Sequence, residues 1–383
     1  MARGARRSAG EAPLTDRNRE AAGVTGLVAG EASAAGPEAR AAWEGYRRQA
    51  DAYFRGSLAV TGTITAVWLY FVVTGRDGGA AFKGYQLSLE ALGRVVVGLT
   101  IMAVLWGWLW YGIKGLLLRK LAGFSKAEVA EVFRSRLQEP FDLKALLARH
   151  SERRVRIADM IGRRGRFMTL GLAAFSYIYA RVASAPTPEF LYLGLQESLF
   201  DAIVYSWLML GLYYSDGFLG RMAYGAQTRI MDGTLGRANC LVITMLWSVF
   251  KFIMVPLGFQ LAAVFPPATY ATLFAFVWLS YLIGDGTAEI VGQLFGTQKL
   301  RVWGIGEVNR KSVAGTWGCF LGSLALCLWL VHANGLGPAW VGLAVAVSLS
   351  NTAFELFSPR GTDDFTMATA NALLCWAFGS FVL

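Results

Sequence analysis

The chain has 383 residues, of which 55% are hydrophobic and only 16% are charged. This composition is too apolar for a soluble α/β protein and predicts an all-α, polytopic integral membrane protein. The formal net charge is +10. The positive residues lie next to the apolar segments, so they indicate membrane topology rather than nucleic-acid binding.

The first 50 residues contain no apolar core segment and are rich in Ala, Gly, Arg and Glu. No signal peptide is visible there. We expect a disordered cytoplasmic tail, residues 1–50, that becomes helical near Arg40–Phe54.

Nine apolar segments follow, each about long enough to cross a bilayer. We therefore expect about nine transmembrane helices: about five in an N-terminal region, 51–265, and the rest in a C-terminal core, 266–383. Three segments are long and uncharged, namely Ser57–Thr74, Val95–Ile113 and Phe365–Leu383. The weaker ones are Phe167–Ala185, Phe190–Tyr214, Ala238–Phe265, Thr269–Gly284, Thr316–Ala333 and Pro338–Phe354.

Along the chain, connections rich in Lys and Arg alternate with connections that carry few or none. The segment 119–166 carries thirteen of them, whereas 186–189, 266–268 and 334–337 carry none. The positive-inside rule then predicts a cytoplasmic N-terminus and an external C-terminus. Within the basic insert, Ser125 followed by Glu128 is typical of a capping box. The insert would form amphipathic helices on the anionic cytoplasmic leaflet, or would act as a topology determinant alone.

The cysteines carry no metal or disulfide signature. Cys240, Cys319, Cys327 and Cys375 all lie within or at the ends of predicted spans, and none forms a C-x-x-C pair. We interpret them as small apolar residues.

A first polar cluster lies just past a predicted span, in the loop 285–315. If the chain is helical there, Asp285, Glu289, Gly292 and Gly296 share one face. The two glycines also match the pattern by which membrane helices pack closely. Carboxylates at a bilayer edge need solvent, a partner or a metal. The alternative to helix packing is therefore a notch for Mg²⁺ and a polyphosphate.

Basic and small residues end the same loop. Arg310 and Lys311 could neutralise phosphate, Ser312 could donate to it, and Gly315 opens the next span at a helix N-terminus. Taken alone, such a pair of cations before a span is a positive-inside anchor.

A second polar cluster joins the last two predicted spans, and it consists of Asn351, Glu355, Ser358, Asp363 and Asp364. The two aspartates could simply cap the last helix. Alternatively, the acids complete a metal site or activate a hydroxyl.

Four charges fall inside predicted spans: Arg181, Glu197, Asp201 and Lys251. Charges at this depth are costly, so each has a partner or a function. We favour a structural ion pair between Asp201 and Lys251, and the alternative is a lining for a polar head group.

These motifs resemble those of a known enzyme family. The run Asp285-x-x-Ala288-x-x-x-Gly292-x-x-x-Gly296, followed by Lys311-Ser312-x-x-Gly315, resembles the nucleotide-binding motif of the dolichol kinase/phytol kinase/CTP-dependent diacylglycerol kinase family. The stretch from Glu355 to Asp364 resembles the closing motif of that family. The resemblance covers about the last 100 residues. Ala314 departs from it, since the family usually has Glu there, and Asp364 stands where Asn is usual. Arg310 stands where Lys is common, and the interval before it is longer than usual.

The resemblance implies Mg²⁺-dependent transfer of a phosphoryl group from CTP, or another nucleoside triphosphate, to a membrane lipid alcohol. It implies no nucleic-acid partner. The metal ligands would be Asp285, Glu289, Asp363 and Asp364, and the catalytic groups Asp285, Lys311 and, as candidate base, Glu355 or Asp363. The nucleotide would contact Ala288, Gly292, Gly296, Arg310, Lys311, Ser312 and Gly315. The site would face the cytoplasm, and a bacterial plasma membrane is favoured.

Two other functions stay open. A CTP-dependent cytidylyltransferase acting on a lipid phosphate would use the same nucleotide and metal but would release pyrophosphate. A transporter or a catalytically degenerate scaffold would show no nucleotide turnover.

Overall fold

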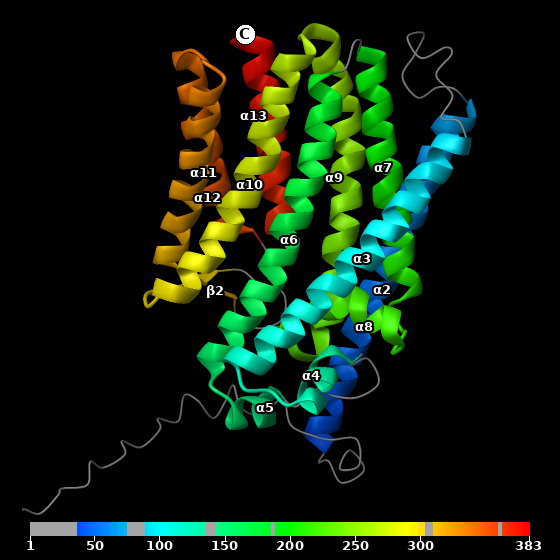
Figure 1. Cartoon of the computed structure of the whole chain (residues 1–383), viewed down its shortest axis with the longest axis vertical. Coiled ribbons are helices and arrows are strands. Elements are labelled where there is room, and N and C mark those ends of the chain that lie inside the picture. Colours follow the sequence, from blue (N-terminus) through cyan, green and yellow to red (C-terminus); the bar gives the residue numbers. More distant parts are fainter. Residues whose placement is uncertain (1–36, 75–88, 135–142, 185–187, 303–308, 359–361) are drawn as a thin grey trace, which may run out of the picture.

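A computed structural model describes residues 37–74, 89–134, 143–184, 188–302, 309–358 and 362–383. Residues 1–36, most of the predicted tail, lie outside this set. The described chain is a bundle of long helices, with short helices and one small hairpin toward one end (Figure 1). The all-α prediction is confirmed apart from that hairpin.

The elements follow one another along the chain in this order: α2 (Pro37–Thr74), α3 (Leu89–Leu121), α4 (Lys126–Phe133), α5 (Leu143–Arg149), α6 (Glu152–Ala183), α7 (Pro188–Gly211), α8 (Phe218–Gly225), η2 (Ile230–Leu235), α9 (Gly236–Val264), α10 (Pro267–Phe295), β1 (Lys299–Val302), β2 (Asn309–Ser312), α11 (Val313–Ala333), α12 (Pro338–Phe357) and α13 (Asp363–Phe381). Helix α2 contains the stretch Arg40–Phe54, so the predicted onset of helix there is confirmed.

Each predicted span falls largely within one long helix. Three helices of the described chain are long and apolar enough to cross a membrane: Ala268–Phe295, Val313–Ala333 and Pro338–Phe357. By length and composition, the chain is therefore a membrane protein. The number of nine spans and the orientation of the chain in the membrane stay predictions. Helix α10 extends to Phe295, well beyond the predicted end of its span at Gly284.

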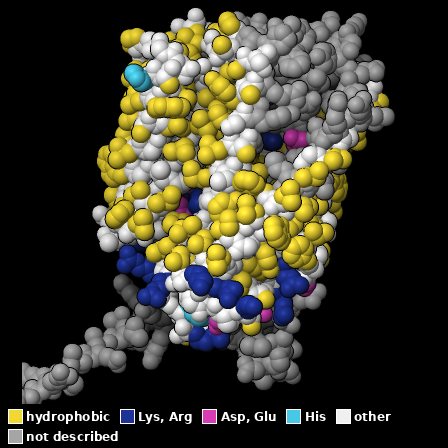
Figure 2. Space-filling model, in the orientation of Figure 1, with side chains coloured by type: hydrophobic (Ala, Val, Ile, Leu, Met, Phe, Trp, Pro, Cys, Tyr) yellow, Lys and Arg dark blue, Asp and Glu magenta, His cyan; other side chains and the backbone are white. Residues whose placement is uncertain are grey.

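Charge and apolarity are separated along the bundle. Lys and Arg side chains gather in a band near one end, above which the surface is mostly hydrophobic (Figure 2). The short helices α4 and α5 lie at this end, which we call the basic end, and the C-terminus lies at the opposite end (Figure 1). Large apolar side chains face outward from α11, where Trp317 is 60% exposed. A lipid-facing surface accounts for such exposure.

The basic insert is held by the predicted capping box, which is confirmed. Ser125 Oγ accepts a hydrogen bond from the Glu128 amide at 3.2 Å, and Glu128 Oε2 accepts one from the Ser125 amide at 2.8 Å. The other oxygen of Glu128 lies 3.0 Å from His150 Nε2 and 3.2 Å from Arg149. The carboxylate thus joins the start of α4 to the end of α5.

A polar ladder fixes the last four helices against one another. Asn371 of α13 donates to Asn351 of α12 at 2.7 Å and to Ser280 of α10 at 3.1 Å. Asn351 in turn donates to Ser323 of α11 at 3.1 Å. All four side chains are fully buried. Because an unpaired amide in an apolar interior is costly, this ladder specifies how the four helices pack.

Helices α10 and α11 approach closely because glycines line their contact. A Cβ added at Gly284 would lie 2.3 Å from Ser323 Oγ, and one added at Gly318 would lie 2.9 Å from the Thr287 carbonyl oxygen. The Thr287 hydroxyl donates to the Gly318 carbonyl oxygen across the contact at 2.8 Å. Small residues at such contacts are the usual means by which membrane helices pack.

The hairpin between α10 and α11 was not predicted. Strands β1 and β2 pair antiparallel, with Lys299 opposite Ser312 and Leu300 opposite Lys311. Ser312 is also the N-cap of α11, and its hydroxyl accepts from the Gly315 amide at 3.1 Å. The hairpin therefore places Lys311 directly at the start of α11.

Candidate functional site

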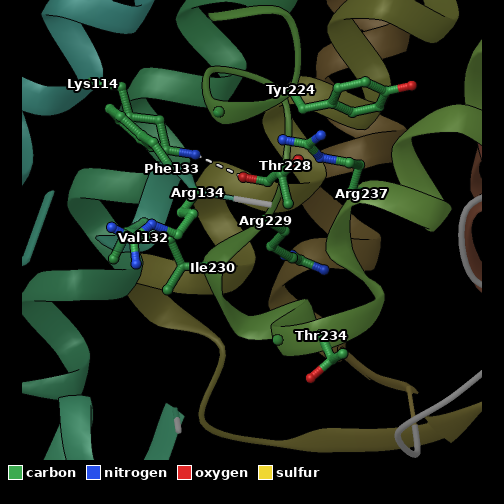
Figure 3. A pocket seen from close by; sticks show the side chains of 12 residues that line it. Lys114, Val132, Phe133, Arg134, Tyr224, Thr228, Arg229, Ile230, Thr234 and Arg237 are labelled. Atoms are coloured by element: carbon green, nitrogen blue, oxygen red, sulfur yellow. Dashed lines mark hydrogen bonds between the residues drawn. The ribbon is translucent and has the colours of Figure 1, made fainter. Parts of the chain in front are cut away.

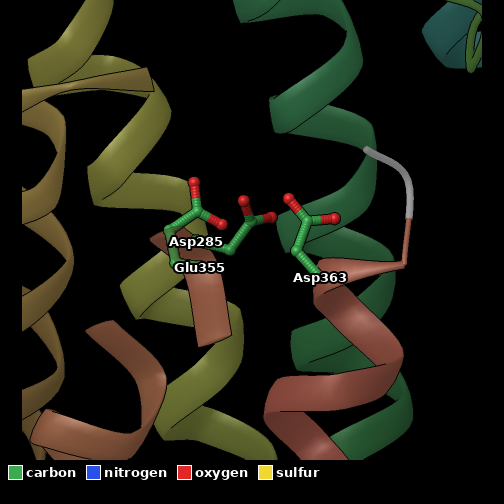
Figure 4. Close-up of side chains that lie close together, drawn as sticks. All are labelled: Asp285, Glu355 and Asp363. Atoms are coloured by element: carbon green, nitrogen blue, oxygen red, sulfur yellow. The ribbon is translucent and has the colours of Figure 1, made fainter. Parts of the chain in front are cut away.

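Three carboxylates from three helices meet beside the hairpin. Asp285 comes from α10, Glu355 from the last turn of α12, and Asp363 from the first residue of α13 (Figure 4). One oxygen from each lies within 4.8 Å of the others. Asp285 is 2% exposed and Glu355 is 7% exposed. We call these residues the acidic trio; the structure thus brings together both sequence clusters.

Lys311 of β2 joins two members of the trio. Its ammonium donates to Glu355 Oε1 at 2.6 Å and to Asp363 Oδ2 at 3.1 Å. Burial would lower the pKa of Lys311, but the charges of Asp363 and Glu355 outweigh burial and hold that pKa above its usual value. Lys311 therefore stays protonated and partly neutralises the trio.

The trio retains oxygen atoms that could bind a cation. In the described part of the chain, Glu355 Oε2 and Asp364 Oδ1 are buried and have no hydrogen-bond partner. Asp364 interacts electrostatically with Asp285 and Arg164, so it lies at the edge of the same group. Clustered carboxylate oxygens suit a hard divalent cation such as Mg²⁺.

Arginines from distant parts of the chain lie against the α10 acids. Arg164 of α6 forms a two-pronged ion pair with Asp285, in which Nη2 donates to Oδ1 at 2.7 Å, and it also pairs with Glu289. Arg163 pairs with Glu289 as well, and Arg229 Nη2 lies 3.1 Å from the same carboxylate. We call Arg163, Arg164 and Arg229 the arginine cluster.

This arrangement separates the two acids of α10. Asp285 lies between Arg164 and the other two members of the acidic trio. Glu289 pairs with all three residues of the arginine cluster, and its side chain is 7% exposed. Glu289 therefore occupies a cationic environment, distinct from the carboxylates with which it was grouped as a metal ligand.

The small residues of the motif line the contact between α10 and the hairpin. A Cβ at Gly292 would lie 2.9 Å from Ser312 Oγ, and one at Gly296 would lie 2.5 Å from the same atom. A Cβ at Gly315 would lie 2.8 Å from the Ala288 carbonyl oxygen. These glycines thus seat Ser312 and the start of α11 against α10, which is the packing alternative that the sequence left open.

The remaining predicted positions are placed as follows. Arg310 stands opposite Arg301 in the hairpin, and its side chain lies outside the described residues. Asn351 belongs to the polar ladder, and the Ser358 hydroxyl bonds that of Thr366 at 2.5 Å. Asp201 interacts electrostatically with Lys251. The side chains of Arg181 and Glu197 are not among those described.

Sequence reasoning missed the arginine cluster as part of the site. Arg163 and Arg164 were counted with the topology-determining charges, since nothing local links them to residues more than 120 positions later. Their glycine neighbours mark a different contact, that of α6 with α3. A Cβ at Gly162 would lie 2.8 Å from Lys114 and one at Gly165 would lie 2.3 Å from Trp110, so α6 packs tightly on α3 at this point.

Comparison with known proteins finds a partial likeness to a phytol kinase. A phytol kinase from Synechocystis sp. is 34% identical over 100 residues, which are 26% of this chain and 41% of the relative. The chain thus spans about two-fifths of the length of that relative. No protein-family model and no solved structure matches. The match supports a relationship to phytol kinase-like proteins over about a quarter of the chain.

Proposed function

We propose that this protein is a membrane lipid-alcohol kinase that transfers a phosphoryl group from CTP, or another nucleoside triphosphate, to an isoprenoid alcohol or diacylglycerol. The observation that carries the proposal is the acidic trio bound to Lys311 at the end of apolar helices. The partial likeness to a phytol kinase agrees with it.

The arrangement suits phosphoryl transfer. Such a reaction needs alignment of donor and acceptor and neutralisation of charge more than covalent chemistry. Bound Mg²⁺ would supply charge neutralisation at the phosphates, held by Asp285 and Asp363, with Asp364 beside them. Lys311 would contribute a fixed positive charge from the hairpin.

A base for the acceptor alcohol is also available. Glu355 lies in the last turn of α12, and its Oε2 is buried and has no hydrogen-bond partner in the described part of the chain. In the proposed reaction this oxygen accepts the hydroxyl proton while Lys311 holds the other oxygen of the same carboxylate. Asp363 is the second candidate for this role.

The test is direct turnover. Purified protein in detergent is incubated with Mg²⁺, γ-labelled CTP, ATP, GTP or UTP, and a panel of phytol, farnesol, a long polyprenol and diacylglycerol. The expected result is a labelled lipid phosphate and release of the nucleoside diphosphate. Transfer of label from α-labelled CTP to a lipid phosphate, with release of unlabelled pyrophosphate, would identify a cytidylyltransferase instead. Absence of lipid phosphorylation with every pairing would overturn the proposal.

A further inference from the structure

A pocket is lined by Arg229 of the arginine cluster, and no residue of the acidic trio lines it. It is formed where α3, the end of α4, α8, η2 and the start of α9 meet. Four cationic side chains line it: Lys114, Arg134, Arg229 and Arg237. Figure 3 shows Lys114 and Arg237 directed toward Thr228 from opposite sides.

Three of these cations already have acidic partners. Lys114 lies 2.7 Å from Asp159, and Arg229 lies 3.1 Å from Glu289. Arg134 lies 3.4 Å from Glu131, and both of those side chains are more than half exposed. The positive charge that is left to the pocket is therefore that of Arg237.

Arg237 is a buried guanidinium held mainly by neutral groups. It is 5% exposed, and its Nη1 donates to the carbonyl oxygens of Tyr213 at 2.7 Å and Ser215 at 3.0 Å. Its Cζ lies 4.6 Å from the centre of the Tyr224 ring, and Asp216 acts on it electrostatically. Among the described residues, its Nη2 has no hydrogen-bond partner. A buried cationic donor left unpaired is costly, so a bound anion would satisfy it.

Thr228 offers a second unused donor in the same place. Its Oγ1 is buried and has no hydrogen-bond partner in the described part of the chain. Its carbonyl oxygen is already occupied, because it accepts from Lys114 Nζ at 2.7 Å. One hydroxyl and one guanidinium nitrogen are thus available to a single ligand.

The size of the pocket restricts that ligand. Its volume is about 30 Å³. By this measure one water needs roughly 10–15 Å³, so the space suits a group the size of about two or three waters. This space admits two or three oxygen atoms of one phosphate group, while the rest of the ligand extends through the open side of the pocket.

We propose that this pocket binds a phosphate group, with Arg237 Nη2 and the Thr228 hydroxyl as its donors. The group belongs either to free phosphate or to the head of an anionic lipid. This site is separate from the acidic trio and does not depend on the proposed kinase reaction.

Ligand-dependent stability tests the proposal. The unfolding temperature of the full chain in detergent is measured against inorganic phosphate, with chloride keeping the ionic strength constant; the rise gives an apparent Kd. A parallel series uses nanodiscs of phosphatidylcholine with and without phosphatidic acid. The variants are Thr228→Val, which keeps the shape of the side chain, and Arg237→Gln. Lys311→Met serves as the control that disturbs the acidic trio instead.

We expect phosphate, or phosphatidic acid, to stabilise the wild type and the Lys311→Met protein. Thr228→Val should weaken this binding about tenfold while leaving the unliganded protein as stable as the wild type, because its hydroxyl has no partner to lose. A response to phosphate identifies a free anion, and a response to phosphatidic acid alone identifies a lipid head group. The proposal is overturned if neither stabilises the protein, or if the Thr228→Val protein responds as strongly as the wild type.

Discussion

Lys311 is bound to two carboxylates that would otherwise repel each other inside the bundle. Its side chain is 16% exposed, so water screens these ion pairs only in part. Removing one member of a buried ion pair leaves its partners charged and unpaired, which costs more than the pair itself contributes.

The Lys311→Met substitution should therefore affect both stability and turnover. We expect a loss of about 3–5 kcal/mol in the free energy of unfolding and a fall of at least about 100-fold in lipid phosphorylation. Thermal unfolding and the labelled-nucleotide assay measure the two effects. Lys299→Met is the matched control, because Lys299 is an exposed cation of the same hairpin. In the Lys311→Met protein, the additional substitution Glu355→Gln should restore part of the stability but none of the activity. Equal activity of the Lys311→Met and Lys299→Met proteins would refute the role of Lys311.

Arg164 can be examined in the same way through its partner Glu289. A double-mutant cycle of Arg164→Gln and Glu289→Gln should give a coupling free energy of about 1–3 kcal/mol, since the two side chains are in direct contact and both are buried. Arg153→Gln is the control on α6, where Arg153 is exposed. Strictly additive effects of the two substitutions in thermal unfolding would contradict this ion pair.

At the scale of residues, the sequence predicted the acids and the lysine but not their pairing. Asp285, Glu355, Asp363 and Lys311 stand out because charges next to apolar spans need a reason. Glu289 was grouped with the metal ligands because helical periodicity predicts which face of the helix a residue lies on. It does not predict which residues of other elements pack against that face. The arginine partners of Glu289 come from α6 and from the residue before η2, and no local pattern encodes such a contact.

At the scale of elements, the contact between α10 and α11 depends on the absence of side chains. Gly315→Ala would place a Cβ 2.8 Å from the backbone oxygen of Ala288, which cannot move away without shifting a helix. We expect a loss of about 1–3 kcal/mol in stability, seen as a lower unfolding temperature. Gly342→Ala on α12 is the control, since nothing lies within 4 Å of its added Cβ. That variant should be neutral or slightly more stable; equal destabilisation of both would show that helix packing is not the cause.

The connection between α4 and α5 should weaken in acid. Hydrogen bonds from Ser125, together with His150, lower the pKa of Glu128 from 4.5 to about 2. A lowered folded-state pKa means that the stabilisation is complete above about pH 4.5 and is lost as the pH falls toward 2. The unfolding temperature of Glu128→Gln should therefore lie below that of the wild type at neutral pH and converge with it in this range. Glu131→Gln on the same helix is the exposed control. A difference in unfolding temperature between Glu128→Gln and the wild type that does not change with pH would contradict this role of Glu128.

The positions of the long helices could be predicted because apolar runs of this length have few other stable conformations in a bilayer. The hairpin could not. Its strands are four residues each: the alternation in Lys299–Val302 is too short to indicate a strand, and Asn309–Ser312 has no apolar residue. The extension of α10 beyond Gly284 was anticipated only as a condition for the shared face of Asp285 and Glu289.

At the scale of the whole molecule, the basic end gives a testable orientation. We predict that the end carrying α4 and α5 faces the cytoplasm and that the C-terminus faces outward. Cysteines are introduced one at a time at Ser125 and at Leu383. In intact cells, a membrane-impermeant maleimide should label the cysteine at position 383 but not the one at position 125. The four native cysteines are buried, so they should give little background. Labelling of the Ser125 position before the cells are permeabilised would reverse the topology.

The arginine cluster also has a consequence for how the protein is made. Arg163 and Arg164 belong to α6, and 121 residues separate Arg164 from Asp285. The ribosome therefore delivers the positive charges well before the acids that pair with them. When α10 emerges, its two carboxylates meet a counter-charge already in place, which lowers the cost of inserting them.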